Sequence, residues 1–465
     1  MLIAIVLLYF ASMGVLGFAL KKRNKTASDF LIAGRKLGIV LTTATLAGVQ
    51  IGAGIVLGSA ETGAQSGLWP GTWYGLGCGF GLILAGLLVA SKLRSVDGFV
   101  PLDFFARRYG ESRWVRLWAW ACNIPSLLGI FVAQVMAAAY VLSIFGFPYH
   151  YALVLVGCVI LMYCILGGMW AIASSSLIQV AILFVGIPVA TLMTLLSVRA
   201  PGLIEKIVSQ PFIPPGMGSK FVFLILPFLL SISISYDAYL RYQSAASGRV
   251  ARWGCVGAGL IVIFITLCTA LIGAAGRLIF PKLPAAFVLP HVIQARMHPV
   301  MAGIVVAALL GAAMSSGTGV LISLAGCCSR DFYNMVLHPN QELDDLKHAK
   351  TVARIVIVLT LLAGLLIAFR ASNILFTIII LNYPYMGSML VPLLGGVLWR
   401  GATPQGARAA MVVGGAIGVA AFVAGIPGRF QGFMNYNLGL LIAWLASTLV
   451  FVIVSLITAK RVQEI

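Results

Sequence analysis

The sequence predicts an all-α integral membrane protein with about thirteen transmembrane helices. Of its 465 residues, 61% are hydrophobic and only 9% carry a charge, which leaves too little polar surface to cover a water-soluble globule. A hydrocarbon core about 30 Å thick requires roughly 20 apolar residues per helix, and runs of this length recur along the whole chain. We place the spans at residues 2–20, 38–60, 68–90, 114–144, 150–172, 175–198, 220–240, 254–279, 299–327, 353–369, 372–398, 408–425 and 436–458.

The first span is expected to remain in the membrane rather than to be cleaved as a signal peptide. A signal peptide carries basic residues before its apolar region, whereas here the cluster KKRNK at 21–25 follows it. The next ten spans form two groups of five, at 38–198 and 220–398, and two spans trail behind them. A group with an odd number of spans starts its second copy from the opposite side of the membrane, so the arithmetic permits an inverted repeat within one transporter domain of residues 1–465.

The basic residues set the expected orientation. If the N-terminus lies outside, 23 of the 31 Lys and Arg residues fall on the same side of the membrane as the C-terminus. The positive-inside rule assigns this side to the cytoplasm. The net charge of +19 is therefore a sign of topology and of contact with anionic membrane lipid, and we expect no nucleic-acid partner. We expect a plasma (inner) membrane location, and the oligomeric state stays open.

Enzyme chemistry finds no support in the sequence. The eight cysteines lie in or at the ends of predicted helices, without the paired spacing of a zinc site, and are interpreted as packing residues. The five histidines are scattered, and no hydrolase, metalloprotease or nucleotide-binding motif is present.

Two stretches place polar groups and glycines inside predicted spans. GVQIGAG at 48–54 surrounds Gln50 with glycines, and GAAMSSGTGV at 311–320 carries the adjacent hydroxyls of Ser315 and Ser316. Polarity in the membrane is costly and tends to mark a functional site, although glycine and serine also serve helix packing, and serine can bond within its own helix.

Five ordered motifs give the chain a resemblance to a known family: SDFLIAGRKLG at 28–38, Gly58 with GL at 67–68, PLDFFARRYG at 101–110, GGMWAIASSSLIQ at 167–179 and GAAMSSGTGVLISLAGCCSRDFY at 311–333. With these motifs the chain resembles the sodium/solute symporter family, which includes proline, pantothenate, sialic acid and sugar carriers. The resemblance implies a LeuT-like fold of inverted five-helix repeats with one leading and two trailing helices. It also implies secondary active transport by alternating access, as sodium-coupled symport (uptake) of a small organic solute such as an amino acid or carboxylate.

The resemblance further implies a site for the co-transported sodium ion between the second and ninth spans. Its ligands, carried over by motif position, are the main-chain carbonyls of Gly48, Ile51 and Ala312 and the hydroxyls of Ser315 and Ser316. A hard cation such as sodium takes oxygen ligands of these kinds.

One position departs from the family pattern. Many members carry an acidic residue shortly before the Gln of the GG…Q motif, and that position is here Ser176. We therefore expect a single sodium ion per cycle. A proton-coupled or uncoupled carrier on the same fold, or a ligand-sensing membrane protein, remains an alternative.

The substrate pocket is predicted from polar and aromatic residues near mid-depth on the spans that line the site in the family: Gln50, Tyr74, Gln134, Ser233, Tyr236, Asn382 and Tyr383. Each has an alternative role as an interhelical hydrogen bond or an aromatic packing residue. Ile55 and Tyr74 stand where sugar-carrying relatives hold a carboxamide or carboxylate, so a sugar substrate is disfavoured.

Two further features receive predictions with alternatives. Pro384 in LNYPYMG is expected to kink its helix, and together with Tyr385 it forms either a moving gate or a static packed kink. Asp237 and Arg241 lie one helical turn apart at the expected cytoplasmic end of the seventh span. They are predicted to form an ion pair near water, with a proton-active Asp237 as the alternative.

Overall fold

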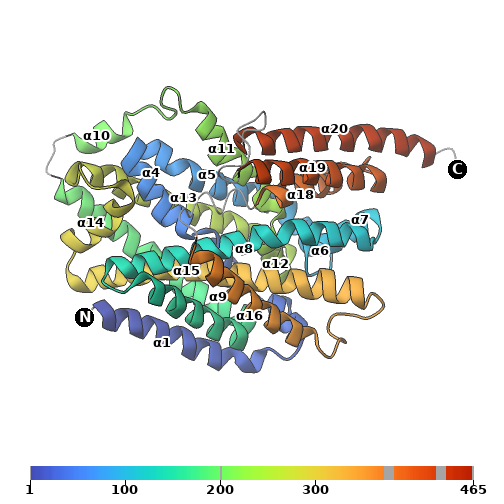
Figure 1. Ribbon diagram of the computed structural model, residues 1–465, viewed down its shortest axis with the longest axis horizontal. Coiled ribbons are helices and arrows are strands. Elements are labelled where there is room, and N and C mark those ends of the chain that lie inside the picture. The colour runs from blue at the N-terminus through green and yellow to red at the C-terminus, as the bar shows by residue number, and fades with distance from the viewer. Residues whose placement is uncertain (1, 199–201, 371–381, 426–435, 463–465) are drawn as a thin grey trace.

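The computed structural model describes residues 2–198, 202–370, 382–425 and 436–462, and within these ranges every regular element is helical. Figure 1 shows long helices packed into one bundle, with the short helices α7 and α10 at its periphery. The helices are α1 (Leu2–Leu20), α2 (Ala27–Ile32), α3 (Ile39–Gln50), η3 (Gly54–Gly58), α4 (Ser59–Ser66), α5 (Leu68–Ala85), η4 (Gly86–Ala90), α6 (Ser91–Ser95), α7 (Pro101–Tyr109), α8 (Arg113–Ile144), α9 (Tyr149–Ser197), α10 (Leu203–Val208), α11 (Gly218–Ser231), η5 (Ile232–Ile234), α12 (Tyr236–Ser244), α13 (Gly248–Ile279), α14 (Val288–Arg296), α15 (Pro299–Gly326), η7 (Cys327–Leu337), α16 (Ala349–Ala368), α18 (Tyr383–Leu398), α19 (Pro404–Gly425) and α20 (Tyr436–Val462).

These helices account for the predicted spans. By length and composition, nine of the described helices can cross a membrane, or eleven when each of two bent helix pairs is taken as one span. α9 contains two predicted spans, and α18 carries the described part of the span at 372–398, whose residues 372–381 lie outside the described ranges. The prediction of an all-helical membrane protein is confirmed.

The boundary between the fifth and sixth spans differs from the prediction. α9 is 49 residues long, which at about 1.5 Å per residue is more than twice what one crossing needs. It is broken at Gly168, whose φ of 51° and ψ of −148° suit glycine. The turn therefore falls within GGMW, a few residues before the 173–174 position that was expected.

Both bent pairs open a group of five predicted spans. The first joins α3 to η3 and α4 with a bend of 60°, and the second joins α11 and η5 to α12 with a bend of 42°. A membrane helix that interrupts its own hydrogen bonds is tolerated where the freed backbone lines a protein-enclosed polar space. The two breaks therefore point to the interior of the bundle.

Close packing in the bundle relies on small residues. α1 packs against α9 and α15, while α18, α19 and α20 form a group at another edge, where α18 also contacts α8 (Figure 1). A methyl group added to Gly63 would lie 2.5 Å from the main-chain oxygen of Ala270, so α4 and α13 meet backbone to backbone. Such contacts are typical of membrane helices, which gain little from apolar burial in lipid. Large apolar side chains such as Leu8 and Leu366 face outward instead.

Candidate functional site

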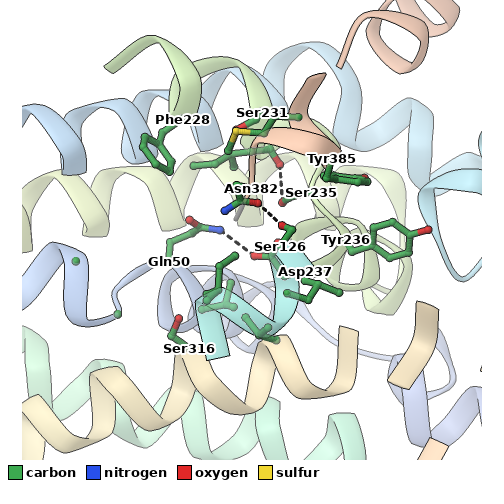
Figure 2. Close-up of a pocket in the computed structure, with 18 of the residues that line it drawn as sticks. Gln50, Ser126, Phe228, Ser231, Ser235, Tyr236, Asp237, Ser316, Asn382 and Tyr385 are labelled. Carbon is green, nitrogen blue, oxygen red and sulfur yellow. Dashed lines mark hydrogen bonds between the residues drawn. The ribbon is translucent and has the colours of Figure 1, made fainter. Parts of the chain in front are cut away.

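A cavity lies inside the bundle where the break after α3 faces α8, α11, α12, α15 and α18. It holds about 700 Å³ of space free of protein atoms, including open solvent. Its lining combines amide, hydroxyl and aromatic side chains with one carboxylate, that of Asp237. Figure 2 shows Gln50 directed toward Asp237, and Ser126 toward Asn382, from helices far apart in the sequence.

The break after α3 frees two of the predicted sodium ligands. In a regular helix the N–H groups of Gly52 and Ile55 would donate to the carbonyls of Gly48 and Ile51. Here the Gly52 N–H donates to the Gln50 carbonyl at 2.8 Å, and the Ile55 N–H donates to the Gly52 carbonyl at 3.2 Å. The carbonyls of Gly48 and Ile51 thus lose their usual helical donors.

Gln134 on α8 supports this break. Its Oε1 accepts a hydrogen bond from the N–H of Ala53 at 2.8 Å, so a side chain satisfies one amide left over by the interruption. The same amide group packs on Gly52, where an added Cβ would come within 2.6 Å of Oε1. Gln134 therefore lines the cavity, as predicted, and also fixes the unwound segment.

The adjacent serines of α15 face different surroundings. Ser315 lies against α3 and α9: its hydroxyl is 2.9 Å from that of Ser176, and a Cβ added to Gly48 would lie 2.5 Å from its Oγ. Ser316, one residue further along the helix, lines the cavity. Both side chains are buried, and α15 continues unbroken through Ala312. The structure thus brings Gly48, Ser315 and Ser176 together, and the chain neighbours Val49 and Ser316 line the cavity.

Most predicted substrate residues line the cavity. The structure places five of the seven around it: Gln50, Tyr74, Gln134, Tyr236 and Asn382. The other two do not line it: the Ser233 hydroxyl donates to the carbonyl of Leu230 at 2.7 Å, and Tyr383 is fully buried at the start of α18.

Pro384 and Tyr385, the residues predicted to form a gate or a static kink, lie at the start of α18. Pro384 is in the first turn of α18, where its missing N–H costs no helical hydrogen bond, and residues 371–381 before it lie outside the described ranges. Tyr385 does line the cavity. Its hydroxyl donates to the carbonyl of Ile234 at 2.8 Å, and its ring meets that of Tyr236 edge-on with centroids 5.6 Å apart. The tyrosine pair closes one wall of the cavity.

The predicted ion pair of Asp237 and Arg241 is wrong. Arg241 is fully buried rather than near water, and its Nη1 donates to the main-chain carbonyl of Asp237, not to the carboxylate. Its Nε donates to the carbonyl of Thr45 at 3.0 Å. α12 begins at Tyr236, after the break that follows η5. Asp237 therefore lies in the first turn of α12, and its side chain lines the cavity. There its Oδ2 accepts a hydrogen bond from Gln50 Nε2 at 3.1 Å (Figure 2).

A buried charge cluster, which the sequence analysis missed, lies where α7, the start of α8 and η7 meet. Arg116 donates from Nη1 to Asp331 at 2.7 Å, from Nη2 to Asp103 at 3.0 Å and from Nε to Glu111 at 2.7 Å. Arg330 adds a second cation beside Asp103, 3.1 Å from its Oδ1. We call these five residues the Arg116 cluster. Asp103 and Asp331 fall within two of the family-like motifs, PLDFF and SRDFY, which was the available signal.

Tyr236 connects the Arg116 cluster to the cavity. The Tyr236 hydroxyl donates to Asp331 Oδ2, while the Tyr236 ring lines the cavity. Burial alone would raise the pKa of Asp103, but the nearby guanidiniums of Arg330 and Arg116 and a main-chain hydrogen bond from Phe99 bring it below the ordinary value of 3.8. Asp103 therefore stays ionised within the cluster.

A bundle in which two bent membrane helices surround a buried polar cavity is the architecture of a secondary transporter. The chain belongs to the sodium:solute symporter family, which it matches over residues 30–414. It is accordingly a sodium-coupled secondary transporter that carries a small solute, with sodium as the co-transported ion, and the predictions of family, fold, transport and the absence of an enzymatic role are confirmed.

Individual proteins agree with this assignment. The chain is 22% identical to a sodium/proline symporter of Staphylococcus aureus, over 97% of this chain and 92% of that protein. Its structure resembles that of a sodium-coupled sialic acid symporter in a substrate-bound outward-open state, with a TM-score of 0.82, 18% identity and 98% of each chain covered. It also resembles MhsT in complex with L-phenylalanine, with a TM-score of 0.56, 15% identity, and 90% of this chain and 98% of that chain covered.

Proposed function

We propose that this transporter binds one sodium ion between the broken α3 and α15, and takes up a small organic solute from the adjacent cavity by alternating access. The sodium ligands are the carbonyls of Gly48, Ile51 and Ala312 and the hydroxyls of Ser315 and Ser316. The solute contacts Gln50, Tyr74, Gln134, Tyr236 and Asn382. Movement of the wall that contains Tyr385 would open and close the cavity.

The main support for this proposal is that main-chain carbonyls without helical donors lie close to a buried hydroxyl. Gly48 and Ile51 have lost their helical donors, and Gly48 lies against the hydroxyl of Ser315. Oxygen atoms that are buried without a full set of donors are costly in a membrane unless a cation or a donor satisfies them. A sodium ion fits this set because it requires several oxygens and no particular charge on them.

Ser176 supports a stoichiometry of one sodium per cycle. Its hydroxyl is bonded to Ser315, so the position that is often acidic in the family here adds a neutral oxygen to the same place rather than a carboxylate for a second ion. Transport of two sodium ions for each solute would contradict this proposal.

We also propose that the two groups of five spans are inverted repeats and that the chain has a defined orientation in the membrane. The two bent helix pairs, α3 with α4 and α11 with α12, each begin one of the two five-span groups, 38–198 and 220–398, which supports an inverted repeat. The positive-inside rule places the N-terminus outside and the C-terminus in the cytoplasm of a plasma (inner) membrane. The amino acid or carboxylate class of the solute agrees with the names of two relatives, a sodium/proline symporter and a sodium-coupled sialic acid symporter.

Solute-dependent sodium entry into proteoliposomes tests the proposal. Vesicles with purified protein are given radioactive sodium outside, alone or with each member of a panel of L-amino acids and carboxylates. We expect at least one solute to accelerate sodium entry and Ser316→Ala to abolish that component. Ser197→Ala is the matched control, because this serine lies at the end of α9 and its hydroxyl donates to the Met193 carbonyl. Normal solute-dependent sodium entry in Ser316→Ala would contradict the assigned site.

A further inference from the structure

Asp237 is the charged group of the cavity. Among the described residues that line it, Asp237 is the only aspartate or glutamate, and no lysine, arginine or histidine joins it. The residue is only 6% exposed. A carboxylate this deep in a membrane protein is costly and tends to mark the path of an ion or a substrate.

The carboxylate of Asp237 has no cationic partner in the described part of the chain. In that part of the chain, no lysine, arginine or histidine nitrogen lies within 4.0 Å of a carboxylate oxygen of Asp237, which is the distance of an ion pair. Its one hydrogen bond, from Gln50 at 3.1 Å, comes from a neutral amide. A neutral donor orients a carboxylate but does not neutralise it.

Arg241 is close in sequence but turned away from the cavity. Its guanidinium bonds to the carbonyl of Thr45 and to the main-chain carbonyl of Asp237, and it packs against Gly319, while Arg241 itself does not line the cavity. The face of the carboxylate toward the cavity is left for another positive group.

The neighbouring walls suit a cation with an organic body. Two pairs of aromatic rings line the cavity: Tyr74 with Phe228, at a centroid distance of 4.6 Å, and Tyr236 with Tyr385. Aromatic faces attract ammonium groups and also bury apolar carbon. A simple anion would instead meet the charge of Asp237 without a facing cation.

We propose that Asp237 binds a protonated nitrogen of the transported solute, so that amino acids or amines, rather than simple carboxylates, are its substrates. This inference rests on the proposed function, because it assigns the solute class of the same cavity. It narrows the earlier choice between amino acids and carboxylates to solutes that carry an ammonium group.

Matched solute pairs test the assignment. Thermal unfolding of the purified protein is followed in sodium chloride with millimolar solutes that differ in an amine: L-alanine against L-lactate, L-phenylalanine against phenyllactate, and L-proline against tetrahydrofuroate. The panel is extended to the other amino acids and to small primary amines. A ligand of the folded state raises the unfolding temperature. We expect stabilisation by one or more amine members and by none of their amine-free partners.

Variants of Asp237 test whether the response to amines is separate from the response to sodium. In Asp237→Asn we expect the concentration of amine needed for half of the shift to rise by about tenfold or more, because a buried charge pair is lost. Stabilisation by sodium alone should persist. Asp345→Asn, at an exposed aspartate, is the matched control and should behave as wild type.

Four outcomes would overturn the inference. The first is equal stabilisation by an amine-free partner, and the second is an unchanged amine response in Asp237→Asn. The third is loss of the sodium response itself in Asp237→Asn, which would assign the carboxylate to a coupling ion. If sodium raises the unfolding temperature of the wild-type protein but no amine raises it further, the inference fails while the proposed function stands. If sodium gives no shift, the proposed function fails first.

Discussion

The two polar regions inside this apolar bundle are built in opposite ways. The Arg116 cluster brings together two cations and three carboxylates, and Arg116 alone bonds to all three acids. The region around Gly48, Ser315 and Ser316 brings hydroxyls close to main-chain carbonyls, and two of those carbonyls have lost their helical donors.

The charged Arg116 cluster is suited to holding the structure together, whereas the neutral region is suited to binding a ligand. Charges that satisfy one another give a rigid contact that is strongly destabilised when one partner is removed. Neutral oxygens that lack donors leave room for a cation, and such a site can release it without leaving a buried charge behind. Tyr236 links the Arg116 cluster to the cavity, because its hydroxyl donates to Asp331 while the residue lines the cavity.

Removal of the shared cation is expected to have the largest effect on stability. Arg116→Leu leaves Asp103, Asp331 and Glu111 with too little positive charge, and breaking a buried pair in this way costs about 3–5 kcal/mol. Thermal unfolding in choline chloride measures this loss. Arg113→Leu, at an exposed arginine three residues earlier, should change little. Equal stability of Arg116→Leu and wild type would show that the cluster does not hold the bundle.

A methyl group at Gly48 is expected to damage the neutral site. In Gly48→Ala the new Cβ would lie 2.5 Å from Ser315 Oγ and 3.1 Å from Ser176 Oγ, and overpacking of this kind costs about 1–3 kcal/mol. We also expect the response of the unfolding temperature to sodium to disappear. Gly186→Ala on α9 is the control, because the nearest atom to its Cβ would be 3.8 Å away. A normal sodium response in Gly48→Ala would separate this contact from the ion site.

Acid is expected to weaken the cluster by a smaller amount. The pKa of Asp103 is below 3.8 in the folded protein, so the folded state binds fewer protons there than the unfolded state. The stability from Asp103 is therefore complete above about pH 5 and is lost as the pH falls through the folded pKa. Unfolding temperatures measured downward from neutral pH should show a smaller acid loss in Asp103→Asn than in wild type. An identical acid loss in both proteins would contradict the lowered pKa.

Hydropathy was sufficient to predict most of the fold. Runs such as 2–20 and 114–144 coincide with α1 and α8 because one physical requirement, the thickness of the membrane, sets their length. The turn at Gly168 was misplaced because the apolar run continues through it, and only one glycine conformation interrupts the helix. A composition signal cannot locate such a point.

The site was predicted in part. Gln50 and Gln134 were found because polar side chains are rare within spans, and both line the cavity. Asp237 was assigned to the end of a span because the sequence does not reveal the break before α12, which moves the carboxylate inward. The Arg116 cluster depends on contacts between residues more than 200 positions apart, as between Arg116 and Asp331, which one sequence does not show.

Sodium-dependent stability of serine variants tests the central claim most directly. Thermal unfolding of wild type, Ser315→Ala and Ser316→Ala is compared in sodium, potassium and choline chloride at equal ionic strength. The account predicts that sodium alone raises the unfolding temperature of wild type, by an amount that grows with its concentration, and that both variants lose this response while remaining folded in choline. A sodium-specific shift of the same size in both variants would contradict the claim that these hydroxyls hold the ion.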